Sequence, residues 1–185
     1  MFNARGQEGA PFELLVAVIV MGFVIFAGMN AMNQLWRQRC YGTIDAKLEE
    51  FKTALETVVD QKGHQAIYFR LSECFDEQNE TIRITDSDEP LFCAEYCGSP
   101  KKTCTILQYS HTGDPTFGIR KCLNIPPDTH FPSARFADEK CPSKENYELQ
   151  DFTDMIPQGY YILINKTSST ETYSTICAYK QTGGE

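Results

Sequence analysis

Cysteine is the residue type whose chemistry stands out in this sequence. The chain has eight cysteines in 185 residues, an unusual load for a protein that folds in a reducing cytosol. The spacing of Cys93, Cys97 and Cys104 could hold a zinc ion. The five other cysteines favour disulfides instead, and an even number indicates folding outside the cytoplasm. The sequence selects no pairing among the predicted disulfide cysteines, which are Cys40, Cys74, Cys93, Cys97, Cys104, Cys122, Cys141 and Cys177.

Two Asn-x-Thr triplets agree with an extracellular location. They begin at Asn79 and Asn165, and each is an acceptor for N-glycosylation in an exported chain. A separate acidic cluster, Asp86, Asp88 and Glu89, offers carboxylates to a calcium ion but lacks the spacing of an EF-hand loop. We therefore interpret this cluster as a solvated turn and predict glycosylation at the two asparagines.

Motifs for catalysis are missing from the sequence. The three histidines, His64, His111 and His130, lie in no H-E-x-x-H pattern, and neither a G-x-S-x-G elbow nor a phosphate-cradling glycine loop occurs. The net charge of −8 argues against a grip on nucleic acid, which needs clustered lysine and arginine. The sequence predicts no enzyme, no cofactor, no metal site and no nucleic-acid contact, and an anchored hydrolase is the least favoured alternative.

A long apolar stretch precedes the first cysteine. From Leu14 to Trp36 there are 23 residues without a charge, and a bilayer span needs about 20. The apolar core of an ordinary secretory signal is shorter, about 7–15 residues, and is followed by a small-residue cleavage site that is missing here. We therefore expect the helix to be retained. Because the cysteines and the two triplets follow it, the C-terminal part is predicted to be extracellular.

The helix is predicted to continue beyond this stretch. After Arg37, apolar residues recur at intervals of three and four, which places them on one face of a helix. The pattern predicts one helix from about Phe12 to Lys62, roughly 77 Å long, with Gly63 as its C-terminal cap. Cys40 lies on the apolar face, so we expect its disulfide partner in the domain that follows. The apolar positions are Cys40, Tyr41, Ile44, Leu48, Phe51, Leu55, Val58 and Val59.

Beyond Gly63 the sequence pattern changes from that of a helix to that of strands. Runs rich in β-branched and aromatic residues alternate with turn-forming clusters such as 86–90 and 98–100. The predicted strands cover residues 67–71, 81–85, 104–109, 117–120, 160–164 and 174–179. The predicted fold class is α+β: a long N-terminal helix whose amphipathic half packs on a C-terminal, disulfide-rich antiparallel β domain, in the form of a lollipop.

The N-terminus carries the most specific pattern. Arg5, Gly6 and Gln7 are followed by an acidic residue, Glu13, and then by the apolar helix. This pattern resembles the class III signal peptide of archaeal type IV pilins and archaellins. The resemblance implies a leader of residues 1–6, which the prepilin peptidase cuts between Gly6 and Gln7 on the cytoplasmic side of the membrane.

The resemblance also divides the rest of the chain. Residues 7–36 would form the hydrophobic helix, which anchors the protein in the membrane and then forms the filament core. Residues 37–63 would be its amphipathic continuation, and residues 64–185 an extracellular β-rich head. In the family the acidic residue is usually fifth after the cut, whereas Glu13 would be seventh, so a cut after Gly9 is the alternative.

By the same resemblance, the chain is predicted to be a structural subunit of an extracellular, type IV pilus-like filament. Its partners would be copies of itself, the prepilin peptidase and the pilus assembly machinery, with the membrane as its location before assembly. The carboxylate of Glu13 would pair with the new α-amino group of a neighbouring copy, since a charge inside a filament is costly unless paired. The alternative is a single-pass anchored surface binding or adhesin domain, as in a minor pilin, that forms no filaments alone.

Overall fold

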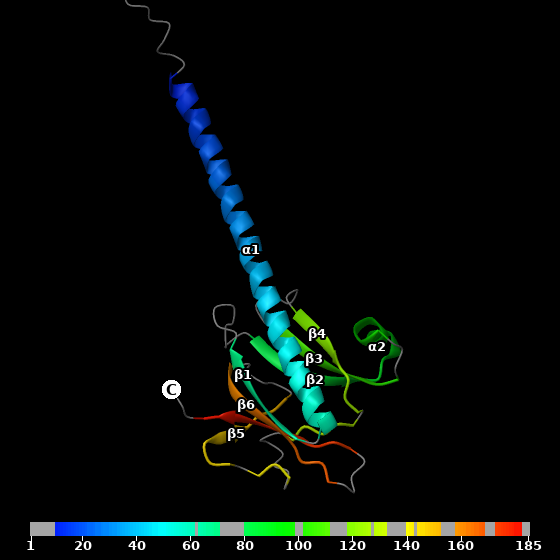
Figure 1. The fold of residues 1–185 in the computed structure, drawn as a ribbon. Coiled ribbons are helices and arrows are strands. Elements are labelled where there is room, and N and C mark those ends of the chain that lie inside the picture. The colour runs from blue at the N-terminus through cyan, green and yellow to red at the C-terminus, as the bar shows by residue number, and fades with distance from the viewer. Residues whose placement is uncertain are drawn as a thin grey trace, which may run out of the picture. The chain divides into compact units, whose positions relative to one another are not determined.

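The computed structural model describes residues 10–61, 63–70, 80–98, 102–111, 118–126, 128–132, 140–142, 144–152, 158–168 and 173–182. The fold is α+β, with one long N-terminal helix and antiparallel sheets, as the sequence predicts (Figure 1). The helices are α1 (Ala10–Gln61) and α2 (Pro90–Cys97). The strands are β1 (His64–Arg70), β2 (Glu80–Ser87), β3 (Cys104–His111), β4 (Gly118–Leu123), β5 (Tyr147–Leu149), β6 (Gln158–Asn165) and β7 (Ile176–Gln181).

The chain divides into two compact units, Met1–Gly42 and Thr43–Glu185, and the boundary falls within α1. In the first unit, the described residues all belong to the N-terminal part of α1. The second unit contains the C-terminal part of α1, the helix α2 and both sheets. The boundary lies close to the point where the apolar sequence gives way to the amphipathic one.

Helix α1 has 52 residues, which corresponds to about 78 Å at 1.5 Å per residue. It begins at Ala10, slightly before the predicted start at Phe12, and its last described residue is Gln61. Charged side chains three residues apart support its polar face: Lys52 Nζ lies 3.2 Å from Glu49 Oε1.

The C-terminal cap predicted at Gly63 stays a prediction, because its backbone geometry depends on Lys62, which lies outside the described residues. The end of α1 receives hydrogen bonds from the side chain of Asn165 in β6.

One antiparallel sheet has four strands in the order β1-β6-β7-β5. Alternate residues of β6 and β7 belong to the same core as α1. Cys177 and Tyr179 of β7 belong instead to a second cluster, which also contains Cys141. Because β7 is covered on both faces, its first four residues, Ile176–Tyr179, are all apolar and all buried.

The other antiparallel sheet has three strands in the order β2-β3-β4. Leu107 and Tyr109 of the central strand β3 belong to the core that contains α1. Ile106 lies on the opposite face, where it packs with residues of α2. Burial on both faces accounts for four consecutive buried residues, Cys104–Leu107. The strands predicted at 81–85 and 104–109 are confirmed.

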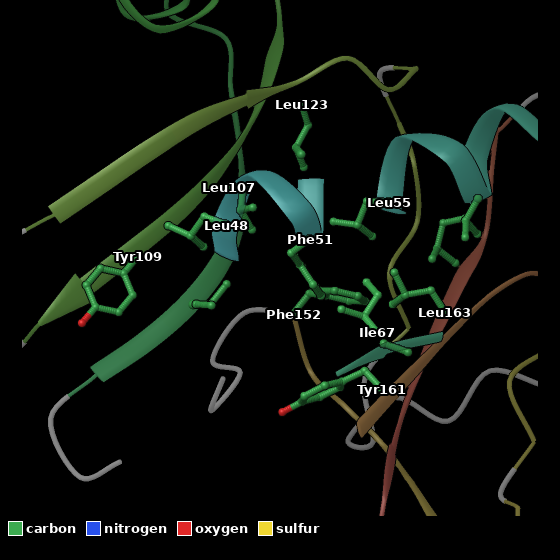
Figure 2. Close-up of a cluster of buried hydrophobic side chains, with 14 of the residues drawn as sticks. Leu48, Phe51, Leu55, Ile67, Leu107, Tyr109, Leu123, Phe152, Tyr161 and Leu163 are labelled. Atoms are coloured by element: carbon green, nitrogen blue, oxygen red, sulfur yellow. The ribbon is translucent and has the colours of Figure 1, made fainter. Parts of the chain in front are cut away.

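The main core of the second unit forms where the apolar stripe of α1 meets both sheets (Figure 2). Leu48, Phe51 and Leu55 of α1 are completely buried. Burying a side chain of this kind contributes about 1.5–3 kcal/mol, so this part of α1 is an integral piece of the domain. The strands add Ile67, Ile82, Leu107, Tyr109, Ile119, Leu123, Tyr161, Leu163, Ile176 and Ala178 to the same cluster.

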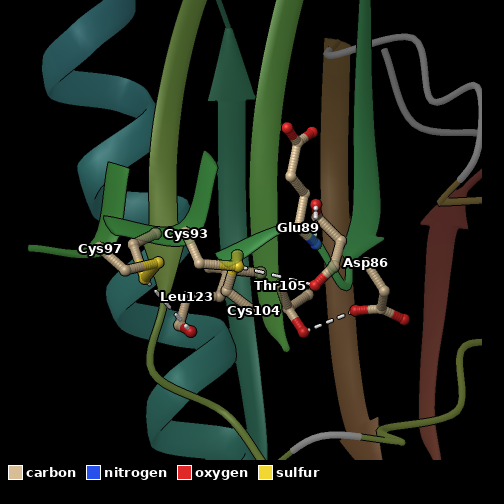
Figure 3. Close-up of a disulfide and its surroundings, with 9 residues drawn as sticks. Asp86, Glu89, Cys93, Cys97, Cys104, Thr105 and Leu123 are labelled. Carbon is tan, nitrogen blue, oxygen red and sulfur yellow. Dashed lines mark hydrogen bonds between the residues drawn. A yellow bond between two sulfur atoms is a disulfide. The ribbon is translucent and has the colours of Figure 1, made fainter. Parts of the chain in front are cut away.

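Three disulfides are present among the described residues. Two of them tie α2 to β3 and β4, and Figure 3 shows their surroundings. The zinc alternative for Cys93, Cys97 and Cys104 is wrong, because these sulfurs are consumed in the two bonds. Cys40 is also disulfide-bonded, and Cys74 lies outside the described residues. The pairs are Cys93–Cys104, Cys97–Cys122 and Cys141–Cys177.

Candidate functional site

The first unit exposes an apolar surface. Every side chain of α1 from Phe12 to Arg39 is exposed, including the whole apolar segment, Leu14–Trp36. Within the segment, Phe23 and Met32 are each 72% exposed. The mean hydropathy reaches 2.5 over 18 residues, so by length and composition this helix is apolar enough to cross a membrane. A continuous exposed apolar surface marks a site of contact with lipid or with another protein.

Glu13 lies in the first turn of α1, immediately before the apolar segment. Its side chain is exposed and borders a shallow groove over Ala17. A carboxylate in the first turn is favoured by the positive end of the helix dipole. Gly6 and Gln7, the predicted processing residues, and the alternative Gly9 lie outside the described residues.

Two glycines of the apolar segment have open space around them in the single chain. At Gly22 and Gly28, a Cβ atom would meet no heavy atom within 4 Å. Glycine inside a helix costs about 1 kcal/mol relative to alanine, so each position carries a cost that the fold of the single chain does not explain. Gly42, the last residue of the first unit, is equally open.

The second unit has a cleft of about 420 Å³ at one end of the β2-β3-β4 sheet, where Asp86, Asp88 and Asp128 contribute to its lining. Asp86 Oδ1 accepts a hydrogen bond of 2.6 Å from the Thr105 hydroxyl (Figure 3). In the part of the chain that the structure describes, no three His, Cys, Asp or Glu side chains are placed to hold a metal ion. The three carboxylates considered for calcium, those of Asp86, Asp88 and Glu89, are therefore not gathered around one ion position.

An aromatic and cationic cluster attaches α2 to β4. The guanidinium carbon of Arg120 lies 5.6 Å from the ring centroid of Phe92 and 5.1 Å from that of Tyr96. Arg120 also donates a hydrogen bond of 2.7 Å to the Tyr96 hydroxyl. Cation–π contacts at exposed sites contribute about 0.5–1 kcal/mol. Because these three side chains contact one another, we interpret the cluster as a structural support for α2.

Charged side chains connect the C-terminal part of α1 to β4. Lys121 Nζ lies 2.6 Å from Asp45 Oδ1 and 3.3 Å from Glu49 Oε2. Burial lowers the pKa of the Lys121 ammonium, but the hydrogen bonds to Asp45 and Glu49 outweigh it and place the pKa above its ordinary value. Burial raises the pKa of the Glu49 carboxyl, but hydrogen bonds from Lys52 and Lys121 outweigh it and place the pKa below its ordinary value.

The predicted glycosylation residues have different outcomes. Asn79 lies outside the described residues. Asn165 ends β6, and its half-buried side chain bonds to the backbone of α1. Glycosylation at both positions stays a prediction.

Comparison with protein-family models, curated proteins and solved structures finds no match to the chain. Two features stand out among the described residues: an exposed apolar segment in one unit and a disulfide-bonded α+β domain in the other. Sequence reasoning missed α2, although Pro90 in its first turn and Gly98 at its end are the usual start and stop signals. No local pattern indicates the contact between Asn165 and α1.

Proposed function

We propose that this chain is a structural subunit of an extracellular, type IV pilus-like filament, held in the membrane before assembly and polymerised through the apolar segment. The observation that carries the proposal is the exposure of the whole segment. Apolar surface of this extent is stable only when lipid or protein covers it. Lipid fulfils this need before assembly, and the corresponding segments of other copies fulfil it in the filament.

The N-terminal pattern supports assembly by copies rather than permanent anchoring. Trimming by the prepilin peptidase after Gly6 would leave a cationic α-amino group on Gln7. The amine of one copy and the Glu13 carboxylate of the next would attract each other with about 4 kcal/mol at 4 Å and an effective dielectric constant of 20, before desolvation is subtracted. Such a pair forms only between staggered copies and would set their register.

The small residues of the segment support close packing between copies. Gly22 and Gly28 have open surroundings in the single chain, and small residues let apolar helices approach closely. The helix of a neighbouring copy would occupy that space. Ala17, Ala27 and Ala31 extend the same property along the segment.

The second unit would form the extracellular head. Its three described disulfides are typical of an oxidising environment. The C-terminal part of α1 packs in the core of this unit, and the backbone of the same helix continues into the assembling segment. The proposed role of the second unit is structural rather than catalytic.

Two matched glycine variants test the proposal in cells that produce this protein. Gly6→Leu should block trimming and leave precursor in the membrane, whereas Gly9→Leu should be trimmed and form fibres; the reverse would move the cut to Gly9. Electron microscopy of sheared surface material, labelled with an antibody against the head, reads out assembly. Trimmed chain that stays in the membrane without fibres would favour the anchored binding domain instead.

A further inference from the structure

The C-terminal end of α1 needs hydrogen-bond donors that the helix itself cannot supply. The last four carbonyl groups of an α-helix have no intrahelical partner, and in α1 they include those of Val58 and Val59. These two residues are only 1% and 6% exposed. A buried carbonyl without a donor is costly.

Asn165 supplies the missing donors. Its Nδ2 donates to the carbonyl oxygen of Val58 at 3.0 Å and to that of Val59 at 3.4 Å. A side-chain amide has two hydrogens on this nitrogen, so one Asn165 side chain can donate to both carbonyls. The backbone N–H of Asn165 also donates to the carbonyl oxygen of Gly63 at 3.1 Å. The end of β6 is thus attached to the end of α1 and to the residue that follows it.

The other end of the Asn165 amide is held by Thr167. Asn165 Oδ1 accepts a hydrogen bond of 2.9 Å from the Thr167 backbone N–H and a second one from the Thr167 hydroxyl. The Thr167 Oγ1 in turn accepts from the backbone N–H of Thr175, which is completely buried, at 3.1 Å. Because the oxygen faces donors and the nitrogen faces acceptors, the network defines the orientation of the amide.

We infer that Asn165 is the C-terminal cap of α1, and that the triplet Asn165-Lys166-Thr167 is a structural clasp rather than a glycosylation site. The cap comes from a residue 107 positions away from Val58 in the sequence, so it closes the domain around the helix. A glycan would replace a hydrogen of Nδ2 and would have to occupy the space between β6 and the end of α1. A glycan at Asn165 would therefore compete with the cap of α1 in the folded second unit.

The test uses the full chain, purified in detergent from cells that N-glycosylate their surface proteins. Peptide mass analysis should find Asn165 unmodified, and a glycan on Asn165 of the folded protein would overturn the inference. Asn165→Asp replaces the donating NH₂ by an acceptor oxygen and should lower the melting temperature by about 4 °C or more. Lys166→Ala, at an exposed position of the same triplet, should melt like the wild type and is the matched control.

Two threonine variants keep the test decisive if Asn165→Asp does not fold. Thr167→Ser retains both the triplet and the hydroxyl, so it should melt close to the wild type. Thr167→Ala removes the hydroxyl bonds to Asn165 and Thr175 and should melt lower. Melting of Thr167→Ala and of any folded Asn165→Asp at the wild-type temperature would overturn the inference.

Discussion

The two parts of α1 share one helical backbone and differ in what surrounds them. In the apolar segment, hydrophobic side chains cover every face and all are exposed. From Thr43 to Gln61, they are confined to one stripe, and this stripe is buried in the domain core. A helix that is apolar all round belongs in a membrane or among other helices, and an amphipathic helix belongs at the surface of a domain. Only the second part is therefore stabilised by the fold of its own chain.

Alanine substitution of one phenylalanine in each part of α1 should give the largest difference between the two parts. Phe51 is completely buried and contacts Phe152, whereas Phe26 is 65% exposed. Phe51→Ala should lower the free energy of unfolding of the second unit by about 3–5 kcal/mol, because it leaves a cavity. Phe26→Ala should leave that free energy unchanged and lower the yield of fibres. Denaturant unfolding and fibre counts check both variants, and equal destabilisation by the two would contradict the contrast.

Removing a disulfide of the second unit should lower the stability of that unit and leave the apolar segment of α1 unaffected. Cys141 and Cys177 are 36 residues apart in the sequence. Replacing both by serine should reduce the free energy of unfolding by about 2–4 kcal/mol, since the unfolded chain gains freedom. The double serine variant of Cys93 and Cys104, which are 11 residues apart, should lose less. Calorimetry measures both losses; wild-type stability in the first variant would show that this bond does not support the fold.

Glu13→Gln tests whether the first part assembles through charge. The change keeps the shape of the side chain, so the stability of the monomer and its trimming should be unaffected. A loss of about 1.4 kcal/mol per contact would weaken each addition step tenfold, and fibres should be few and short. Co-expression with the wild type should restore part of the yield. Glu95→Gln, at an exposed position of α2, is the control; equal fibre yields would show that Glu13 only rests at the membrane surface.

Gly28→Ala should stabilise the helix of the single chain and weaken the packing of that helix against neighbouring copies. In the single chain, the added methyl group has open space and improves helix propensity by about 1 kcal/mol. Between packed copies, the same methyl group would hold the helices apart, so fibres should be fewer. Gly42→Ala should give the same helical gain without loss of fibres. Helix content by circular dichroism and fibre counts check the pair, and normal fibres from Gly28→Ala would remove the packing role of this glycine.

The smallest expected effect is the pH dependence of the Lys121 network. The pKa of Glu49 is lowered from 4.5, so its stabilisation is present above that pH and is lost as the pH falls through the folded-state value. The pKa of Lys121 is raised from 10.5, so its stabilisation is present below that pH and is lost as the pH rises further. Partly exposed pairs contribute about 0–1 kcal/mol.

Lys121→Met provides the measurement. Between pH 4.5 and 10.5 the wild type should exceed the variant in free energy of unfolding by a constant amount, and the difference should shrink outside that window. Denaturant titrations at a series of pH values check this. A difference that is the same at pH 3 would show that the contact acts through packing of the lysine stem rather than through charge.

The elements that the sequence predicts are those with a long or regular local signal. The apolar stripe with Leu48 and Leu55 has the spacing of a helix over many turns, so α1 is predicted almost to its ends. The β-branched residues of β2 and β3 indicate strands in the same way. The three-residue strand β5 is too short for such a signal, and α2 is hidden between two turn-like clusters.

What the sequence does not predict is how distant residues meet. The pairing of Cys97 with Cys122 depends on α2 lying on the face of β4, and spacing alone does not reveal it. Asn165 is predicted as a surface acceptor because its triplet has the required letters. Its bonds to Val58 and Val59 arise only when β6 lies at the end of α1. The exposure of Glu13 follows from the sequence pattern, and its partner belongs to another copy in the proposed filament.

N-terminal sequencing of this chain, taken from sheared surface fibres that electron microscopy shows to be uniform, tests the central claim most directly. The proposed assembly through the first part of α1 predicts that the chain in the fibres begins at Gln7, or at Ala10 if the cut follows Gly9. It also predicts that this chain is the main component of the fibres. A chain that begins at Met1 and is found only in the membrane fraction would contradict the proposal.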